Sequence, residues 1–150
     1  MSFHPRTIPP EQVADVIAVQ QLAVLYAYAL DAREYDLLDE IFTPDAQLYA
    51  SSGSVMTRAQ YKEQCVTVLP TLDATHHITT NTLVDVDGDT ARARSYFQAQ
   101  HVKRALAPDS TFLMAGWVDD IVVRVDGRWQ IAQRRWTSVW SSGNPAVLAR

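Results

Sequence analysis

The stretch that decides the fold is YAYALDAREYDLLDEIFTPD, which runs from Tyr26 to Asp45. It ends a long apolar helix, starts a second helix and stops at Thr43-Pro44-Asp45. Its unusual feature is Asp31, which follows a run of Val, Leu, Ala and Tyr. A carboxylate at the edge of a protein core is rare unless it has a partner. Asp31 therefore needs a partner from elsewhere in the chain.

The segment before Asp31 has the pattern of a buried helix. Proline and glutamate at Pro10-Glu11 are typical of a helix start, and apolar residues from Val13 to Leu30 cover much of the circumference. Such a helix is expected to be enclosed by the rest of the fold. The three prolines within residues 1–10 predict an extended arm ahead of it.

After Asp31 the pattern changes several times over a short distance. Residues 37–42 give a short helix with an apolar stripe, and residues 46–50 read as a short strand. Thr57, with Gln60 three residues later, is a capping-box signature for another helix. That helix should end near Leu69, just before a proline.

From His76 onward the apolar residues alternate, which predicts strands. The expected strands cover residues 78–86, 90–103, 111–125 and 128–140, with turns at Asp87-Gly88-Asp89 and Asp126-Gly127. Residues 141–150 are expected to be an unstructured, flexible tail. Helices followed by strands predict an α+β fold, in which helices pack on one side of a curved, mostly antiparallel sheet and leave a ligand cavity between them.

The composition fits one soluble domain spanning residues 1–150. The chain is 47% hydrophobic and 20% charged, which is ordinary for a globular protein. Its net charge of -4 and lack of a Lys/Arg cluster argue against a nucleic-acid partner. The single cysteine, Cys65, excludes an internal disulfide and reads as a buried inert thiol. Without an evident signal peptide or bilayer-spanning run, a cytoplasmic protein with no membrane partner is expected.

The expected partner of Asp31 lies in THHITTN, residues 75–81. Adjacent strand residues point to opposite faces, so only one of its two histidines can enter the cavity. His77 should share its face with Thr79 and Asn81, and His76 should lie at the surface or pack. In the next strand His101 alternates with small and apolar residues and is expected to face inward.

A carboxylate beside a histidine suits general-base chemistry. It fixes the ring proton on one nitrogen, leaves the other nitrogen as the base and stabilises the imidazolium that forms. The chain has no nucleophile motif, glycine-rich phosphate loop or HExxH helix. We therefore expect no metal and no cofactor. The alternatives are that Asp31 only caps a helix or bridges between helices, with Arg33 or Arg135 as its partner, and that His77 is a satisfied core residue.

The segment ALDAREYDLLDEIFTPDA, with Tyr26 before it and Trp129-Gln130-Ile131 late in the chain, resembles the SnoaL-like branch of the nuclear transport factor 2-like superfamily. The resemblance covers roughly Val13 to Trp140. It implies a cone-shaped α+β barrel but no particular activity, because this fold hosts many functions.

The chemistry resembles that of scytalone dehydratase and hexachlorocyclohexane dehydrochlorinase within the superfamily. Each pairs an aspartate at the end of the first helix with a histidine that opens the sheet, and Asp31 and His77 match these positions. His101 matches a second pocket histidine of the dehydratase, where it would help a hydroxyl depart as water. Leu30 stands where the dehydratase has a tyrosine.

Four aromatic residues are candidate substrate-binding groups. Tyr26 or Tyr28 would replace the missing tyrosine, Tyr49 roughly matches a second pocket tyrosine, and Trp117 is placed near the pocket. Aromatic residues at helical spacing more often pack in a core, so each of these roles has a plain packing alternative.

The function expected from these features is a cofactor-independent lyase of the dehydratase kind. Asp31 and His77 would abstract a proton from a small hydrophobic, oxygenated ring compound in a closed pocket. An isomerase, a hydrolase or a polyketide cyclase in the same pocket, or a non-catalytic ligand-binding module, remains an alternative. The apolar outward strand faces predict a homodimer, and the lyase relatives suggest a homotrimer.

Overall fold

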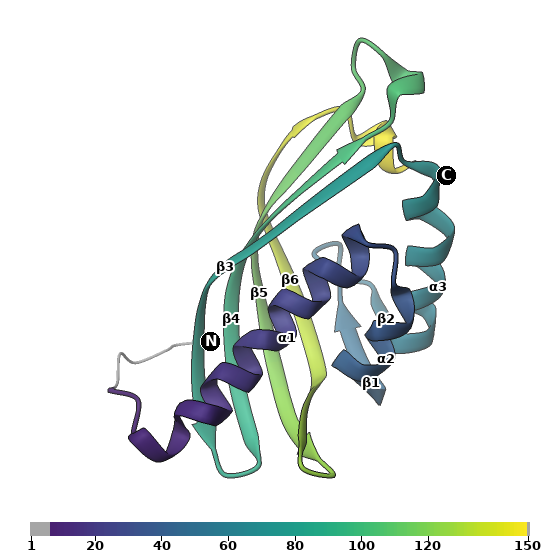
Figure 1. Cartoon of the computed structure of the whole chain (residues 1–150). Coiled ribbons are helices and arrows are strands. Elements are labelled where there is room, and N and C mark those ends of the chain that lie inside the picture. Colours follow the sequence, from purple (N-terminus) through teal and green to yellow (C-terminus); the bar gives the residue numbers. More distant parts are fainter. Residues whose placement is uncertain (1–6, 150) are drawn as a thin grey trace.

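A computed structural model describes residues 7–149 (Figure 1). The long apolar helix is followed by two short helices and two strands, then by a third helix, and finally by the four long strands of the sheet. Residues 1–6 of the expected arm lie outside the described residues. The helical elements are η1 (Pro10–Gln12), α1 (Val13–Asp31), η2 (Tyr35–Leu37), α2 (Leu38–Ile41), α3 (Arg58–Val68), η3 (Leu69–Thr71), η4 (Arg104–Leu106) and η5 (Pro145–Leu148). The strands are β1 (Phe42–Tyr49), β2 (Val55–Thr57), β3 (Ala74–Asp87), β4 (Thr90–Val102), β5 (Thr111–Val125) and β6 (Arg128–Gly143).

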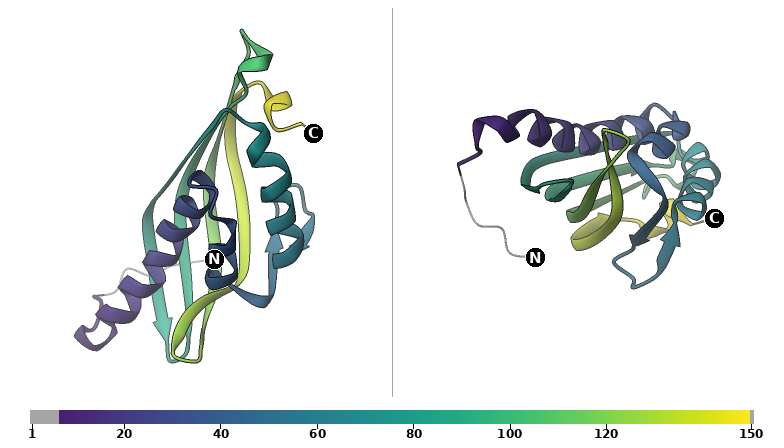
Figure 2. Two further views of the ribbon diagram at one scale, coloured as in Figure 1. Left: turned by 45° about the vertical axis from the view of Figure 1, so that its right-hand side comes forward. Right: turned by 90° about the horizontal axis from the view of Figure 1, so that it is seen from below.

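The six strands form one curved, open sheet in the order β2-β1-β6-β5-β4-β3. All neighbours are antiparallel except β1 and β6, which run parallel. Helix α1 lies diagonally across β3 to β6, and α3 stands beside the sheet (Figures 1 and 2). The α+β class and the curved, mostly antiparallel sheet are therefore confirmed, as a cone that does not close.

Only one side of α1 is covered. Its buried residues are Val16, Val19, Leu22, Ala23, Tyr26, Ala29 and Leu30. Apolar side chains on the opposite side, Val13, Ile17, Val24 and Tyr28, are exposed. The expectation of an enclosed helix is therefore wrong, because the curved sheet covers a single face of α1.

Helix α1, together with η1, is long and apolar enough to span a membrane. The 22 residues Pro10–Asp31 include a window with mean hydropathy 1.6, contrary to the expectation that no run reaches this length. In this fold 44% of that window is buried. A core helix of a globular domain meets the same criteria, and here the helix is used to cover the sheet.

The register of β3 breaks after Thr80, which changes the faces of the next residues. Asn81 has a φ of 54° and is exposed, so it does not share the face of His77 as expected. Thr82 takes the inward position and its hydroxyl lies 2.9 Å from that of Ser95. A bulge of this kind inserts an extra residue and resets the alternation.

Residues 141–149 are structured, so the expectation of an unstructured tail is wrong. Strand β6 continues to Gly143, whose φ of 91° turns the chain into η5. The Asn144 N–H donates to the Thr111 carbonyl at 2.8 Å, and the Asn144 side chain accepts from the Ala146 N–H at 3.0 Å. Val147 is 0% exposed. Gly143 and Pro145, which usually end a helix or strand, here turn the chain back against the sheet.

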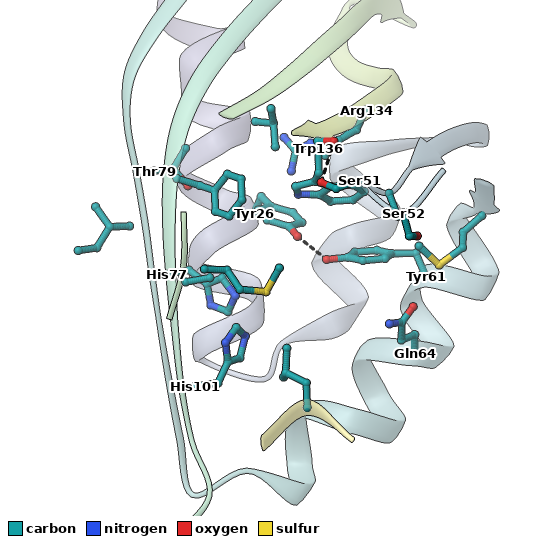
Figure 3. A pocket seen from close by; sticks show the side chains of 18 residues that line it. Tyr26, Ser51, Ser52, Tyr61, Gln64, His77, Thr79, His101, Arg134 and Trp136 are labelled. Atoms are coloured by element: carbon teal, nitrogen blue, oxygen red, sulfur yellow. Dashed lines mark hydrogen bonds between the residues drawn. The ribbon is translucent and has the colours of Figure 1, made fainter. Parts of the chain in front are cut away.

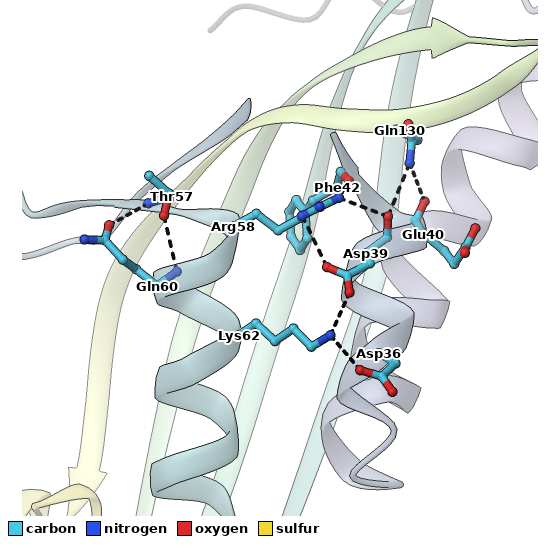
Figure 4. A network of polar contacts seen from close by, with 9 residues as sticks. All are labelled: Asp36, Asp39, Glu40, Phe42, Thr57, Arg58, Gln60, Lys62 and Gln130. Atoms are coloured by element: carbon cyan, nitrogen blue, oxygen red, sulfur yellow. Dashed lines mark hydrogen bonds and ion pairs between the residues drawn. The ribbon is translucent and has the colours of Figure 1, made fainter. Parts of the chain in front are cut away.

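A polar network fixes α3 against α2 (Figure 4). The predicted capping box is present, since the Gln60 N–H donates to Thr57 Oγ1 and the Thr57 N–H donates to the Gln60 side chain. Lys62 Nζ lies 2.6 Å from carboxylate oxygens of both Asp36 and Asp39. With this face of α3 held by α2, its neighbouring face, which carries Tyr61, lines the space enclosed by the sheet.

Candidate functional site

Asp31 and His77 meet where the end of α1 reaches the start of β3. His77 Nδ1 lies 2.6 Å from Asp31 Oδ1, and the His77 backbone N–H donates to Asp31 Oδ2 at 2.7 Å. The Thr75 hydroxyl also donates to Oδ1, at 2.8 Å. Asp31 is therefore held by three donors from one strand. It does not bridge to Arg33 or Arg135.

These donors decide the charge of Asp31. Burial raises the pKa of the carboxyl, but the hydrogen bonds from the His77 backbone, the His77 ring and Thr75 outweigh it, so the pKa lies below its ordinary value. A carboxylate only accepts hydrogen bonds, which places the ring proton on Nδ1. In the neutral form of the ring, His77 Nε2 then carries the lone pair that can face a ligand.

His101 lies beside His77 and is 5% exposed. The two ring centroids are 5.6 Å apart, with planes at 87°. His101 Nδ1 lies 3.3 Å from the Phe112 carbonyl, which can only accept. Burial, followed by the nearby His77, lowers the pKa of His101 to about 4. At neutral pH His101 therefore carries one ring proton, on Nδ1, and offers Nε2 as an acceptor.

The two histidines line a cavity of about 380 Å³ between α1, α3 and the sheet (Figure 3). Apolar side chains form much of its wall: Met56, Ile78, Phe97, Ala99, Met114, Val118, Trp136 and Leu148. Ser51, Ser52 and Gln64 also line it and are exposed, so the cavity has a polar rim. A space of this size and lining suits a small apolar molecule with few polar groups.

Two tyrosine hydroxyls meet within the cavity, across from the histidines (Figure 3). Tyr26 comes from α1 and Tyr61 from α3, and their hydroxyls are hydrogen-bonded to each other. Burial raises the pKa of both well above the ordinary value. Both hydroxyls therefore keep their protons. One proton is used between the two oxygens, and the other can donate to a ligand or to the thiol of Cys65, which also lies within hydrogen-bonding reach of Tyr61.

A buried cation supports this end of the cavity. Arg134, 1% exposed, makes two 2.8 Å bonds to the carboxylate of Asp120. Its guanidinium lies 4.3 Å from the centroid of the Tyr26 ring. Burial opposes its charge, but Asp120 raises the pKa of Arg134. The next residue, Arg135, points the other way along the strand and is exposed.

Three of the predicted binding residues do not line the cavity. Tyr28 is 51% exposed and donates to Glu34 at 2.8 Å, because two residues along a helix turn the side chain away from the face of Tyr26. Tyr49 donates to Gln47 and alternates away from buried Leu48. Trp117 lies on the outer sheet face beside Tyr96, with ring centroids 6.4 Å apart.

Tyr61, Arg134 and Trp136 contribute to the site without having been singled out as site residues. Tyr61 is the one aromatic residue of α3, but no sequence pattern shows which face of that helix is turned toward the sheet. Cys65 is buried and free, as expected. Within residues 7–149 no group of three or more His, Cys, Asp or Glu side chains is arranged to hold a metal ion.

The depressed pKa of His101 predicts acid sensitivity. The unfolded chain binds a proton at His101 below about pH 6.5, whereas the folded chain does so only near pH 4, so stability should fall as the pH drops through this window. Between pH 7 and 4.5 the loss attributable to His101 should be about 2 kcal/mol. The loss is measured by urea unfolding of the wild type and of His101→Gln at both pH values, as the difference between the two proteins. Equal losses in the two proteins would contradict the assignment.

Comparison with known proteins agrees with this architecture. A family model described as a SnoaL-like domain matches residues 11–135. The uncharacterized protein Rv2910c of Mycobacterium tuberculosis is 36% identical over 127 residues, which cover 82% of this chain and 84% of the relative.

Two solved structures share the fold at low sequence identity. A Novosphingobium aromaticivorans protein provisionally named scytalone dehydratase has a TM-score of 0.80 and 24% identity, covering 89% of each chain. Hexachlorocyclohexane dehydrochlorinase LinA-type3 from Novosphingobium barchaimii has a TM-score of 0.77 and 17% identity, covering 90% of this chain and 93% of that one. Because the family model matches most of its length, the chain belongs to the SnoaL-like domain family.

Proposed function

We propose that the protein is a cofactor-independent lyase that eliminates water from a small, largely apolar, oxygenated ring compound. The observation that carries the proposal is the 2.6 Å contact between Asp31 and His77, a histidine that lines an apolar cavity. The names of the two structural neighbours, a dehydratase and a dehydrochlorinase, support the same kind of chemistry.

His77 is the proposed general base. With its Nδ1 proton directed at Asp31, its Nε2 can take a proton from the carbon next to a substrate carbonyl. Asp31 stabilises the imidazolium that results, and such a base contributes on the order of 10²–10⁴ in rate. The carboxylate stays ionised at neutral pH because its pKa is depressed.

The tyrosine pair gives the substrate its orientation. Tyr26 and Tyr61 have one hydroxyl proton that can donate outside the pair, which suits a carbonyl oxygen that becomes an enolate when the proton leaves. Arg134, behind the Tyr26 ring, adds positive charge near that oxygen. The carbonyl then faces the helices, and the acidic carbon faces His77 on the sheet.

The proton taken from carbon can also complete the elimination. The enolate re-forms the carbonyl, the bond between carbon and the departing hydroxyl breaks, and His77 Nε2 returns its proton to that oxygen as water. His101 has no proton on Nε2, so it can orient the departing hydroxyl as an acceptor but cannot protonate it. The products are a conjugated ketone and water.

The test is a panel of cyclic ketones with a hydroxyl β to the carbonyl, incubated with the protein in D₂O. Ultraviolet absorbance reports the conjugated product, and proton NMR reports exchange at the α-carbon. Product formation supports the lyase. Exchange without elimination would favour the isomerase or cyclase alternative, and binding with neither would favour a non-catalytic module.

Removing the Tyr61 hydroxyl should slow the reaction without removing the base. In Tyr61→Phe the remaining Tyr26 hydroxyl can still donate, so we expect α-proton exchange to fall by about 10–100-fold, at or below the usual effect of one lost donor. Tyr96→Phe is the matched control, because its hydroxyl lies on the exposed outer face of β4. Equal rates in both variants would remove Tyr61 from the proposed mechanism.

A further inference from the structure

Thr75 is the third donor to Asp31 and has no role in the chemistry described so far. It lies two residues before His77 on the same face of β3 and opposite His101 on β4. Its hydroxyl donates to Asp31 Oδ1 at 2.8 Å, the same oxygen that accepts from His77 Nδ1 at 2.6 Å. Oδ2 accepts separately from the His77 backbone N–H at 2.7 Å.

We infer that Thr75 is a positioning residue, whose hydroxyl keeps the Asp31 carboxylate ionised, with Oδ1 directed at the His77 ring, and so keeps the shared proton on His77 Nδ1. The His77 ring and the His77 backbone N–H already hold one carboxylate oxygen each. Thr75 adds a second donor to Oδ1, which stabilises the charged carboxylate and makes this oxygen a weaker acceptor for the ring proton.

The need for such a donor follows from where Asp31 stands. It is the last residue of α1, and the C-terminal end of a helix disfavours a negative charge. No basic residue lies in the last turn of α1, and the carboxylate is partly buried. Both effects favour protonating the carboxylate. A hydroxyl bonded to the charged form opposes them, because it stabilises that form alone.

The proton location can be measured without any substrate. Nitrogen-15 NMR of the histidine rings at pH 7.5 distinguishes protonation at Nδ1 from protonation at Nε2. We expect His77 to be protonated at Nδ1 in the wild type and in Thr75→Ser, which keeps the hydroxyl, and to become a mixture of tautomers in the nearly isosteric Thr75→Val. Thr79→Val makes the same change two residues beyond His77 and should leave the His77 signals unchanged.

The carboxylate gives a second readout. Carbon-13 titration of Asp31 should show a higher pKa in Thr75→Val than in the wild type, and Thr75→Ser should restore the lower value. If Thr75→Val matches the wild type in both the tautomer and the titration, the positioning role is overturned.

The effect on rate rests on the proposed function. If the protein is a lyase, kcat in Thr75→Val should fall about tenfold, the lower range for removing a residue that orients a reacting group, while KM changes little and Thr75→Ser restores kcat. If the tautomer shifts but the wild type converts no substrate, the positioning role of Thr75 stands and the lyase proposal fails. The two inferences are therefore tested apart.

Discussion

In the His77→Gln variant, deuterium exchange at the α-carbon of a bound ketone is expected to fall by about 10²–10⁴-fold, the usual contribution of a general base. Glutamine keeps a hydrogen-bonding side chain of similar length but has no nitrogen that can accept a proton. Asp31→Asn should cause a loss of similar order, because an amide can hold the ring in the wrong tautomer. The rates are measured by proton NMR in D₂O.

The neighbouring residue provides the control. His76 is exposed on the other face of the same strand, so His76→Gln makes the identical chemical change beside the site and should keep the wild-type exchange rate. If His77→Gln exchanges as fast as His76→Gln, His77 is not the base. A circular dichroism spectrum like that of the wild type shows that the loss does not come from misfolding.

Gly116→Ala is expected to destabilise the protein by more than about 3 kcal/mol, beyond the usual 1–3 kcal/mol of an overpacked core. A Cβ atom at this position would lie 1.9 Å from the Thr137 carbonyl oxygen and 3.0 Å from its carbon. Both are backbone atoms of β6, at the point where the register of β5 and β6 shifts. The clash cannot be relieved by rotating a side chain, so the strands must separate.

Gly53→Ala separates this clash from the general effect of replacing glycine. Gly53 has a φ of 91° and no atom within 4 Å of its added Cβ, so its substitution introduces backbone strain alone. That strain should cost about 1 kcal/mol. Urea midpoints of the two variants, at equal slopes, give the comparison. A Gly116→Ala variant as stable as Gly53→Ala would contradict the close approach of β5 and β6.

The Asp31–His77 contact could be predicted because it depends on strong local signals. The apolar run ending at Asp31 marks the end of α1, and strand alternation admits only one of His76 and His77 to the cavity. The choice of His77 comes from the resemblance to the aspartate–histidine pairs of the superfamily. The inward direction of His101 follows from the same alternation, since its neighbours two residues apart are small or apolar. The arguments from the apolar run and from strand alternation use one element at a time and need no knowledge of how elements pack.

The aromatic residues of the cavity could be predicted only with knowledge of how the helices pack on the sheet. Tyr26 and Tyr28 lie five and three residues before Asp31, and only the orientation of α1 on the sheet decides which one faces inward. The direction of Trp117 depends on a register shift in β5 between Ala115 and Gly116. Tyr61 reaches Tyr26 only because α3 is held against α2. The periodicity of a single segment does not show how one helix or strand is oriented relative to another.

The parallel pairing of β1 with β6 also affects how the chain folds while it is being synthesised. Phe42 is synthesised early, whereas its partner Ile131 follows 89 positions later, and α1 must wait for β3 to β6 before its apolar face is covered. A growing chain on the ribosome therefore carries an uncovered helix as hydrophobic as a membrane span. Folding is delayed until the last strand emerges, since distant pairings form slowly. During that interval α1 is the segment that chaperones would bind and through which newly made chains would aggregate.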